Sequence, residues 1–279
     1  MDECFSKFFL EDNEVKNKEK FNDDVLEKGK SLYEVIRIID GKPLFLKAHL
    51  DRLDNSFNVT GLKLWLGRRE IADEILKLID INKIYAGNVK LIFNFYRGRR
   101  FLAYFVEHHY PVPEDYKTGV RTDFFQVERE NPNAKVINQE YRARVGKKIR
   151  ESNIFEAILV DNSGNITEGS KSNIFMIKDE KVITPPLKRV LPGTTRSIII
   201  KICGRLRLDV LEKDVSCEDI DKFDAVFISG TSPKVLPVKS LGNIKFNSSN
   251  NEILLKIMQA YDEEIKGDIN NFKKTKYVR

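Results

Sequence analysis

The chain has 279 residues, of which 41% are hydrophobic and 32% charged, and its formal net charge at pH 7 is +6. This length is enough for about two domains, and the hydrophobic fraction is enough for real cores. The high charged fraction argues against a membrane protein. In addition, no run approaches the ~18 apolar residues needed to span a bilayer.

The cysteines and the charge pattern limit the compartment and the partners. Cys4, Cys203 and Cys217 are odd in number and lack metal-ligand spacing, which predicts reduced thiols and no metal site. The acidic N-terminus has no signal-peptide pattern, so we expect a cytoplasmic protein. The basic residues are scattered and lack interleaved aromatic residues. We therefore expect neither a nucleic-acid partner nor a membrane partner.

The first part of the chain predicts paired strands and amphipathic helices. Alternating β-forming residues indicate strands, and an apolar stripe at helical spacing indicates a helix. Gly98 lies in the turn between the last two strands, where its backbone is free to take a positive φ. In chain order the predicted elements are a strand over 32–39, helices over 45–62 and 68–79, and paired strands over 89–96 and 101–106.

The stretch Tyr110-Pro111-Val112-Pro113-Glu114-Asp115 is typical of a linker, because its prolines favour extended backbone. We therefore expect an N-terminal domain over 1–110, a linker over 111–118 and a C-terminal domain over 119–279.

The second part of the chain also mixes strands with helices. Asn131–Ala134 predicts a turn, and the polar stretch 245–251 predicts a loop. The predicted strands cover 120–127, 155–161, 172–178, 181–184 and 225–229, and the predicted helices cover 135–151, 194–206 and 253–265.

Three features of the second part are chemically suggestive in combination. Lys135 opens a predicted helix, Glu168 lies in a predicted tight turn, and Pro192–Thr195 forms a helix start. Taken singly, these are a surface lysine, a hairpin carboxylate and a helix start that binds water. Together they supply what pyridoxal phosphate (PLP) requires, namely an amine, a carboxylate beside its ring nitrogen and N–H donors for its phosphate.

Four sequence blocks in a fixed order strengthen this interpretation. The stretch from about Gly29 to Val238 resembles the fold-type IV PLP enzymes, which include branched-chain aminotransferases, D-amino-acid aminotransferases and aminodeoxychorismate lyases. The blocks are Gly29–Arg37 with Asp40-Gly41 and His49–Leu53; Lys135 with Asn138; Glu168–Phe175 with Pro192–Arg196; and Ser229–Ser232 with Leu236–Val238.

The resemblance implies an α/β (α+β) fold with a smaller N-terminal α/β domain and a larger C-terminal domain that has a barrel-like sheet. It also implies a homodimer, with the cofactor held between the domains. Lys135 matches the Schiff-base lysine, Arg52 the phosphate-binding arginine and Glu168 the partner of the ring nitrogen. The other cofactor-binding positions that it implies are Asn173, Leu191, Gly193, Thr194, Thr195 and Thr231.

The substrate pocket is less specific. Lys90 could pair with a substrate carboxylate or be a solvated strand residue, and Arg97 could be a pocket cation or an exposed turn residue. Tyr141 is displaced by one position from the tyrosine of branched-chain enzymes, where this chain has Glu140. The candidate substrate residues are Tyr33, Lys90, Arg97, Tyr141 and Ser232.

The resemblance and these residues favour a PLP-dependent aminotransferase, which moves an amino group between an amino acid and a 2-oxo acid by a ping-pong reaction. Two alternatives stay open. One is a lyase of the aminodeoxychorismate type, and the other is a basic binding protein that has lost the cofactor.

Overall fold

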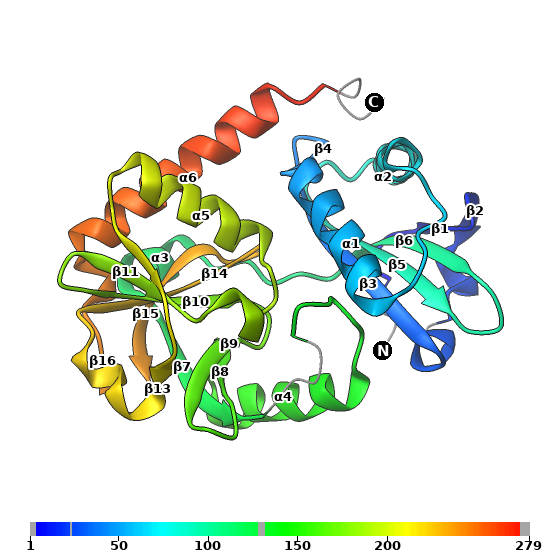
Figure 1. Ribbon diagram of the computed structural model, residues 1–279. Helices are drawn as coiled ribbons and strands as arrows, with labels where there is room; N and C mark the ends of the chain where they lie inside the picture. The colour runs from blue at the N-terminus through cyan, green and yellow to red at the C-terminus, as the bar shows by residue number, and fades with distance from the viewer. Residues whose placement is uncertain (1–3, 23, 128–131, 274–279) are drawn as a thin grey trace. The chain divides into compact units, whose positions relative to one another are not determined.

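The computed structural model describes residues 4–22, 24–127 and 132–273, and it divides into two compact units (Figure 1). The first unit contains the described residues up to His109, the segment Ala134–Ile137 and the described residues from Ile265 onward. The second unit contains the described residues of Tyr110–Asn133 and the whole of Asn138–Glu264. The short segment around Lys135 therefore packs with the N-terminal part of the chain.

The first unit is built on a six-stranded antiparallel sheet, which contains the three predicted strands of this part of the chain. Two short 3-10 helices, η1 (Lys18–Lys20) and η2 (Asp24–Glu27), precede its third strand. In sheet order the strands are β2 (Glu14–Asn17), β1 (Phe8–Glu11), β6 (Arg100–Val106), β5 (Gly87–Phe95), β3 (Lys30–Ile39) and β4 (Lys42–Pro43).

Two helices share a core with one face of this sheet, and both predicted helices are confirmed as α1 (Leu46–Thr60) and α2 (Arg68–Asn82). Alternate residues of β3, such as Leu32 and Ile36, join this core because side chains alternate between the two faces of a strand. Tyr33 lies on the opposite face, against a separate cluster that includes residues of the N-terminal segment.

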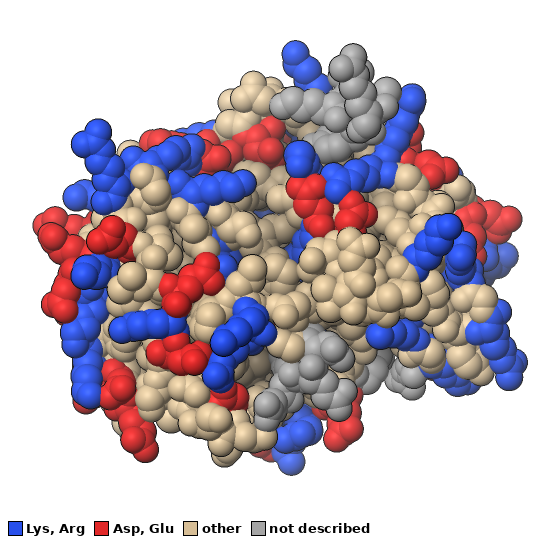
Figure 2. All heavy atoms as spheres, in the orientation of Figure 1, with Lys and Arg blue, Asp and Glu red and all other residues tan. Residues whose placement is uncertain are grey.

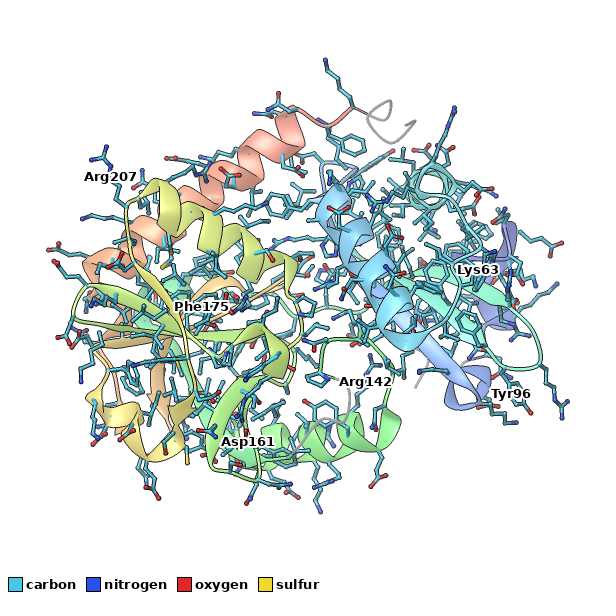
Figure 3. All side chains as sticks on the ribbon, viewed as in Figure 1. Lys63, Tyr96, Arg142, Asp161, Phe175 and Arg207 are labelled. Atoms are coloured by element: carbon cyan, nitrogen blue, oxygen red, sulfur yellow. The ribbon has the colours of Figure 1, made fainter. Side chains whose placement is uncertain are left out.

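The turn between β5 and β6 has left-handed backbone at Arg97 (φ +53°) and Gly98 (φ +137°). Tyr96, labelled in Figure 3, precedes this turn, and the Arg97 guanidinium lies 5.3 Å from its ring centroid. The predicted turn is therefore confirmed, and glycine fits the second position because it lacks a Cβ.

The second unit is built on a ten-stranded mixed sheet, and all five predicted strands are confirmed. In sheet order the strands are β12 (Val210–Glu212), β11 (Lys181–Thr184), β10 (Asn173–Lys178), β14 (Ala225–Gly230), β15 (Lys234–Leu241), β7 (Val120–Gln126), β8 (Glu156–Val160), β9 (Asn165–Gly169) and β13 (Val215–Ser216). Strand β7 pairs in parallel with both β8 and β15, and β16 (Ile244–Lys245) pairs with β15 alone.

One hydrophobic core joins strands from the two ends of this order. Ile183 of β11, Ile166 of β9 and Val215 of β13 all lie in the same cluster. A flat sheet would hold these strands far apart, so the sheet must curve around its core. The predicted barrel-like sheet is therefore confirmed.

Four α-helices of the described chain lie in the linker region or beyond it. The predicted helix over 194–206 is confirmed as α5, and the closing helix α6 is longer than its predicted span of 253–265. Three 3-10 helices, η3 (Leu187–Arg189), η4 (Cys217–Lys222) and η5 (Ser248–Asn250), lie in the connections. The α-helices are α3 (Pro113–Thr118), α4 (Gln139–Ser152), α5 (Thr194–Arg205) and α6 (Glu252–Asn270).

Three local predictions need correction. The expected linker over 111–118 contains α3, because Pro113 occupies the first helical position, where a missing N–H costs nothing. The expected loop over 245–251 includes the end of β16 and the short helix η5. The predicted turn at 131–134 is described only from Pro132 onward, and Asn131 lies outside the described residues.

No helix in the described ranges is long and apolar enough to cross a membrane. On the face of the molecule in Figure 2, basic side chains are interspersed with acidic ones. Such mixing of both signs is typical of a solvated surface.

Candidate functional site

Lys135 lies in an extended segment that pairs with strand β3 in the first unit. The Tyr33 N–H donates to the Lys135 carbonyl at 3.0 Å, and the Ile137 N–H donates to the Ser31 carbonyl at 3.0 Å. The prediction that Lys135 opens a helix is therefore wrong. Helix α4 begins four residues later, because Asn138 caps it by accepting a hydrogen bond from the Tyr141 N–H at 2.9 Å.

The pairing places two lysine amines beside one aromatic ring. Lys135 Nζ lies 4.7 Å from the centroid of the Tyr33 ring, and Lys90 Nζ lies 5.5 Å from the same centroid. Lys90 is only 3% exposed, so its interpretation as a solvated strand residue is wrong. Lys90 Nζ also lies 5.9 Å from the ring of Tyr104, which pairs with it across β5 and β6. Both amines are thus within the range of cation–π attraction.

Arg52 is held in the same unit by a buried carboxylate. Its Nε and Nη2 donate to the two oxygens of Glu34 at 2.8 and 2.5 Å, a bidentate pairing between α1 and β3. His49, one turn earlier on α1, places Nδ1 2.9 Å from Glu34 Oε2. Arg52 Nη1 donates no hydrogen bond to any described residue, so this one donor group is available for a ligand.

Electrostatics explain why this cluster is stable although it is buried. Burial alone would raise the pKa of Glu34, but the charge and hydrogen bonds of Arg52 more than offset it and hold the pKa at about 2. Burial lowers the pKa of His49, and its hydrogen bond to Glu34 offsets only part of this effect. The cluster therefore holds one ion pair and a neutral imidazole at neutral pH.

In the second unit, Glu168 is 3% exposed and lies in strand β9. Its predicted place in a tight turn is wrong, because the turn begins one residue after Gly169. Glu168 Oε2 accepts the Leu191 N–H at 3.0 Å and lies 3.4 Å from Asn173 Nδ2. Asn173 Nδ2 also donates to the Leu191 carbonyl at 3.0 Å. The carboxylate is therefore fixed by uncharged donors.

Three of the predicted cofactor residues meet in this network, and a fourth lies next to it. Gly193 is the N-cap of α5, and a Cβ on it would lie 1.9 Å from Asn173 Oδ1, so no other residue fits without movement. The next residues, Thr194 and Thr195, are buried and begin α5. No side chain caps this helix start, whose first N–H groups have no partners within the helix. Such a start suits an anion.

The other predicted site residues lie in turns or at the start of α4. Thr231 and Ser232 are half-buried in the turn between β14 and β15. Tyr141 is half-buried in the first turn of α4 and packs against the cluster of Val145, Ile154 and Ala157. Arg97 is exposed in its turn, so its pocket interpretation gains no support from the geometry.

Sequence reasoning gave no role to three buried groups, Glu34, His49 and Glu156. Glu34 could have been noticed, because it lies at an inward position of an alternating strand, where a carboxylate needs a buried partner. His49 and Arg52 are three residues apart and therefore share one face of a helix. The spacing alone would not have shown that both face Glu34.

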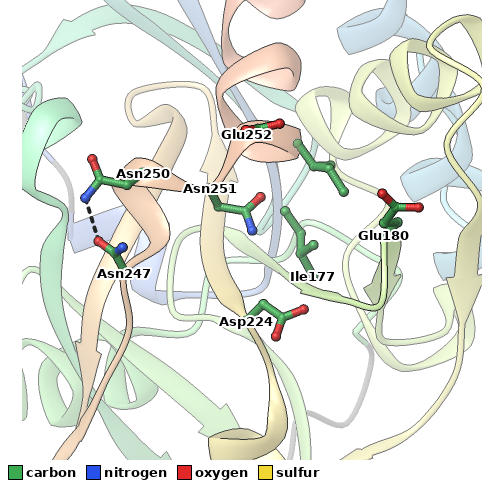
Figure 4. Close-up of a pocket in the computed structure, with 8 residues that line it drawn as sticks. Ile177, Glu180, Asp224, Asn247, Asn250, Asn251 and Glu252 are labelled. Carbon is green, nitrogen blue, oxygen red and sulfur yellow. Dashed lines mark hydrogen bonds between the residues drawn. The ribbon is translucent and has the colours of Figure 1, made fainter.

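A pocket lies in the second unit, and its lining includes none of the predicted site residues (Figure 4). Asn250 Nδ2 donates to Asn247 Oδ1 at 2.6 Å within it. Among the described residues, no group of three or more His, Cys, Asp or Glu side chains is placed to hold a metal ion. The pocket is lined by Ile177, Glu180, Asp224, Asn247, Asn250, Asn251, Glu252 and Ile253.

The chain resembles known aminotransferases over most of its length. It is 28% identical over 257 residues to a putative branched-chain-amino-acid aminotransferase of Methanocaldococcus jannaschii, covering 84% of this chain and 87% of the relative. It is 29% identical over 227 residues to the D-alanine aminotransferase of Bacillus licheniformis, covering 76% and 79%.

Solved structures share the fold. The branched-chain amino acid aminotransferase of Escherichia coli superimposes with a TM-score of 0.83 at 23% identity, covering 94% of this chain and 96% of that one. The branched-chain enzyme of Thermoproteus uzoniensis, solved with norvaline, gives 0.83 at 22% identity, covering 98% of each chain. A putative 4-amino-4-deoxychorismate lyase of Legionella pneumophila gives 0.75 at 24% identity, covering 88% and 94%. These likenesses confirm the predicted fold class.

The family model for amino-transferase class IV matches residues 31–241, which include Arg52, Lys135, Glu168 and the start of α5. The uncapped start of α5 fits a group with an anionic phosphate. The interpretation as a binding protein without enzyme activity is therefore wrong. The chain belongs to the class IV aminotransferases, the PLP-dependent enzymes that move an amino group between an amino acid and a 2-oxo acid.

Proposed function

We propose that Lys135 is the lysine that holds PLP and that its amine moves the proton of the substrate's α-carbon. When bound, PLP supplies an electron-accepting ring, which stabilises the electrons left by that proton. The location of Lys135 supports this role, because backbone pairing with β3 fixes its main chain while its side chain reaches the Tyr33 ring.

By the family resemblance, Arg52 of the first unit is a phosphate-binding arginine, and Gly193, Thr194 and Thr195 at the start of α5 are phosphate-binding positions. Glu34 occupies Nε and Nη2 of Arg52 and so fixes the direction in which Nη1 points. Thr231 contributes its hydroxyl to the same phosphate. These donors are neutral or positive, as a dianion requires.

Glu168 holds the proton of the cofactor's ring nitrogen. Its carboxylate is suited to this role because Leu191 and Asn173 orient it through uncharged donors, so its negative charge is not neutralised by an ion pair with either of them. Asn173 and Leu191 therefore act through Glu168, and Leu191 also supplies an apolar side chain next to the helix start.

The observation that carries the substrate assignment is the burial of Lys90 beside Tyr33 and Lys135. The amine of Lys90 therefore places a cation beside the Tyr33 ring and the Lys135 amine. Lys90 binds a carboxylate of the amino acid or 2-oxo acid, and Tyr33 packs against the rest of the substrate. Tyr141 and Ser232 are further candidates for substrate contact.

Replacing Lys90 by Met tests this assignment, because the side chain keeps most of its length and loses its charge. We expect Lys90→Met to lower kcat/KM for amino acid and 2-oxo acid by about 10- to 100-fold, the cost of one hydrogen bond to a charged group. The matched control is Arg97→Met, which removes an exposed cation and should change kcat/KM by less than about twofold. A larger loss in Arg97→Met than in Lys90→Met would contradict the assignment.

Two coarser features complete the proposal. The protein acts as a homodimer, as the resemblance to its family suggests, which sedimentation equilibrium measures directly. It works in the cytoplasm, where its three free cysteines stay reduced. Cell fractionation tests this location.

A further inference from the structure

A buried carboxylate, Glu156, lies against the turn that joins Glu168 to Asn173. Glu156 belongs to strand β8 and is 4% exposed. Its Oε1 accepts hydrogen bonds from the Ser170 hydroxyl and from the Lys171 N–H, the latter at 3.1 Å. Both donors are in the turn, so this one carboxylate oxygen ties the turn to the sheet.

Glycine at position 169 lets the turn pack closely onto Glu156. A Cβ on Gly169 would lie 2.0 Å from Ser172 Oγ and 3.2 Å from Glu156 Cγ. The Gly169 N–H donates to the Ser172 carbonyl at 2.8 Å, and the Ser170 N–H donates to the Ala157 carbonyl at 2.9 Å. The turn is therefore closed by its own backbone and anchored to β8 at two points.

This turn separates the two residues that matter for the ring nitrogen. Glu168 immediately precedes Gly169, and Asn173 immediately follows Ser172. Glu168 Oε2 accepts the Leu191 N–H at 3.0 Å, and Asn173 Nδ2 lies 3.4 Å from the same oxygen. A shift of the turn would move both residues, and it would change the hydrogen bond from the Leu191 N–H to Glu168.

We propose that Glu156 is a positioning residue, which holds the turn 170–172 so that Glu168 and Asn173 keep their relative positions. This inference rests on the proposed role of Glu168. Burial raises the pKa of Glu156, and the hydrogen bond from Ser170 opposes this effect. Burying a carboxylate costs stability. A smaller apolar residue at this position would avoid that cost, but it could not accept the hydrogen bonds that hold the turn.

The test compares Glu156→Ala with Glu74→Ala, a control that removes another buried carboxylate, on α2 of the first unit. Hydrogen exchange of the Leu191 amide is measured by NMR in the full chain without cofactor. Glu156→Ala should speed this exchange by at least about tenfold, the equivalent of one typical buried hydrogen bond. Glu74→Ala should leave it unchanged.

The loaded enzyme gives the second measurement. Glu156→Ala should lower kcat by about 10- to 100-fold and change KM by less than about threefold, since a small misplacement of a charge partner acts mainly on the chemical step. If Glu156→Ala lowers only the melting temperature, and both Leu191 exchange and kcat stay at wild-type values, the proposal is wrong.

Two further variants keep the outcome decisive. If Glu156→Ala does not fold, Ser170→Ala removes one of the two donors, and unchanged Leu191 exchange in that variant would refute the proposal. Glu168→Gln separates this inference from the proposed function. Near-normal turnover in Glu168→Gln would overturn the role of Glu168, whereas the effect of Glu156→Ala on Leu191 exchange would still be observed.

Discussion

The ion pair between Glu34 and Arg52 should make a pH-dependent contribution to the stability of the first unit. The folded-state pKa of Glu34 is lowered from 4.5 to about 2, so the folded state binds this proton less tightly than the unfolded state does. The contribution is therefore fully present above pH 4.5 and is lost as the pH falls toward 2. A difference of this size corresponds to about 3 kcal/mol at neutral pH.

The substitution Glu34→Gln removes the charge and leaves Arg52 buried without its counter-ion. We expect the free energy of unfolding at pH 7 to fall by about 3 to 5 kcal/mol, the cost of breaking a buried ion pair. At pH 3 the wild-type protein has itself lost about 2 kcal/mol of this contribution, so the difference between wild type and variant should shrink by that amount.

Fluorescence of Trp65 offers a specific assay. It is the only tryptophan of the chain, and its ring lies 5.4 Å from those of Phe93 and Phe95 in the core of the first unit. Urea unfolding of the cofactor-free protein, followed by this signal at several pH values, therefore reports on the unit that contains the pair.

The matched control is Glu74→Gln, the same substitution in the same unit. Burial raises the pKa of Glu74, so its ionised form makes no comparable contribution to stability. We expect a change below about 1 kcal/mol. The reasoning is refuted if Glu34→Gln costs less than about 1 kcal/mol at pH 7, or if its deficit stays constant between pH 7 and pH 3.

Two further predictions concern the cofactor. Lys135→Ala should abolish turnover, and borohydride should fix PLP to Lys135 of the wild-type protein; mass spectrometry that finds the label on another lysine would contradict the assignment. Gly193→Ala should weaken PLP binding by at least about tenfold in equilibrium dialysis, because its Cβ would meet Asn173 Oδ1 at 1.9 Å. Gly204→Ala in the same helix meets nothing within 4 Å and should bind PLP normally.

Most of the fold could be predicted from the sequence because burial follows simple periods. The residues of β3 alternate between the two faces, and α2 buries Ile71, Ile75, Leu78 and Ile79 at helical spacing. These patterns depend on neighbouring residues alone. The same patterns cannot specify pairing between distant segments, which is why the sequence predicts a helix at Lys135 and the structure shows none there.

The pairing of Val136 with Leu32 shows what the local pattern lacks. The segment around Lys135 has no repeating pattern, so its conformation is set by the part of β3 that β4 does not pair with, and by the Ser56 hydroxyl, which accepts the Lys135 N–H at 3.4 Å. At Pro113 the sequence predicts an extended linker, and the structure shows a helix instead. The fixed φ of proline suits both extended backbone and the first position of a helix, and tertiary contacts decide between them.

Burial of Lys90 could not be predicted for a related reason. Alternation places Lys90 on one face of β5 but does not say what covers that face. In the structure, Phe9, Phe21 and Leu26 of the N-terminal segment pack into the cluster on that face. A strand with one face on the helical core would ordinarily leave the other face to water, and here the N-terminal segment removes it from water.

The two units fix their functional charges by different physical means, and this difference predicts how each responds to substitution. Arg52 is oriented by an opposite charge, Glu34, so its position depends on pH and on an intact ion pair. Glu168 is oriented by the Leu191 N–H and the Asn173 amide, neither of which titrates. Acid should therefore disturb Arg52, the arginine proposed to bind the phosphate, while the Leu191 N–H and the Asn173 amide keep their protons. PLP affinity should then fall as the pH is lowered, before the Leu191 amide loses its protection from exchange.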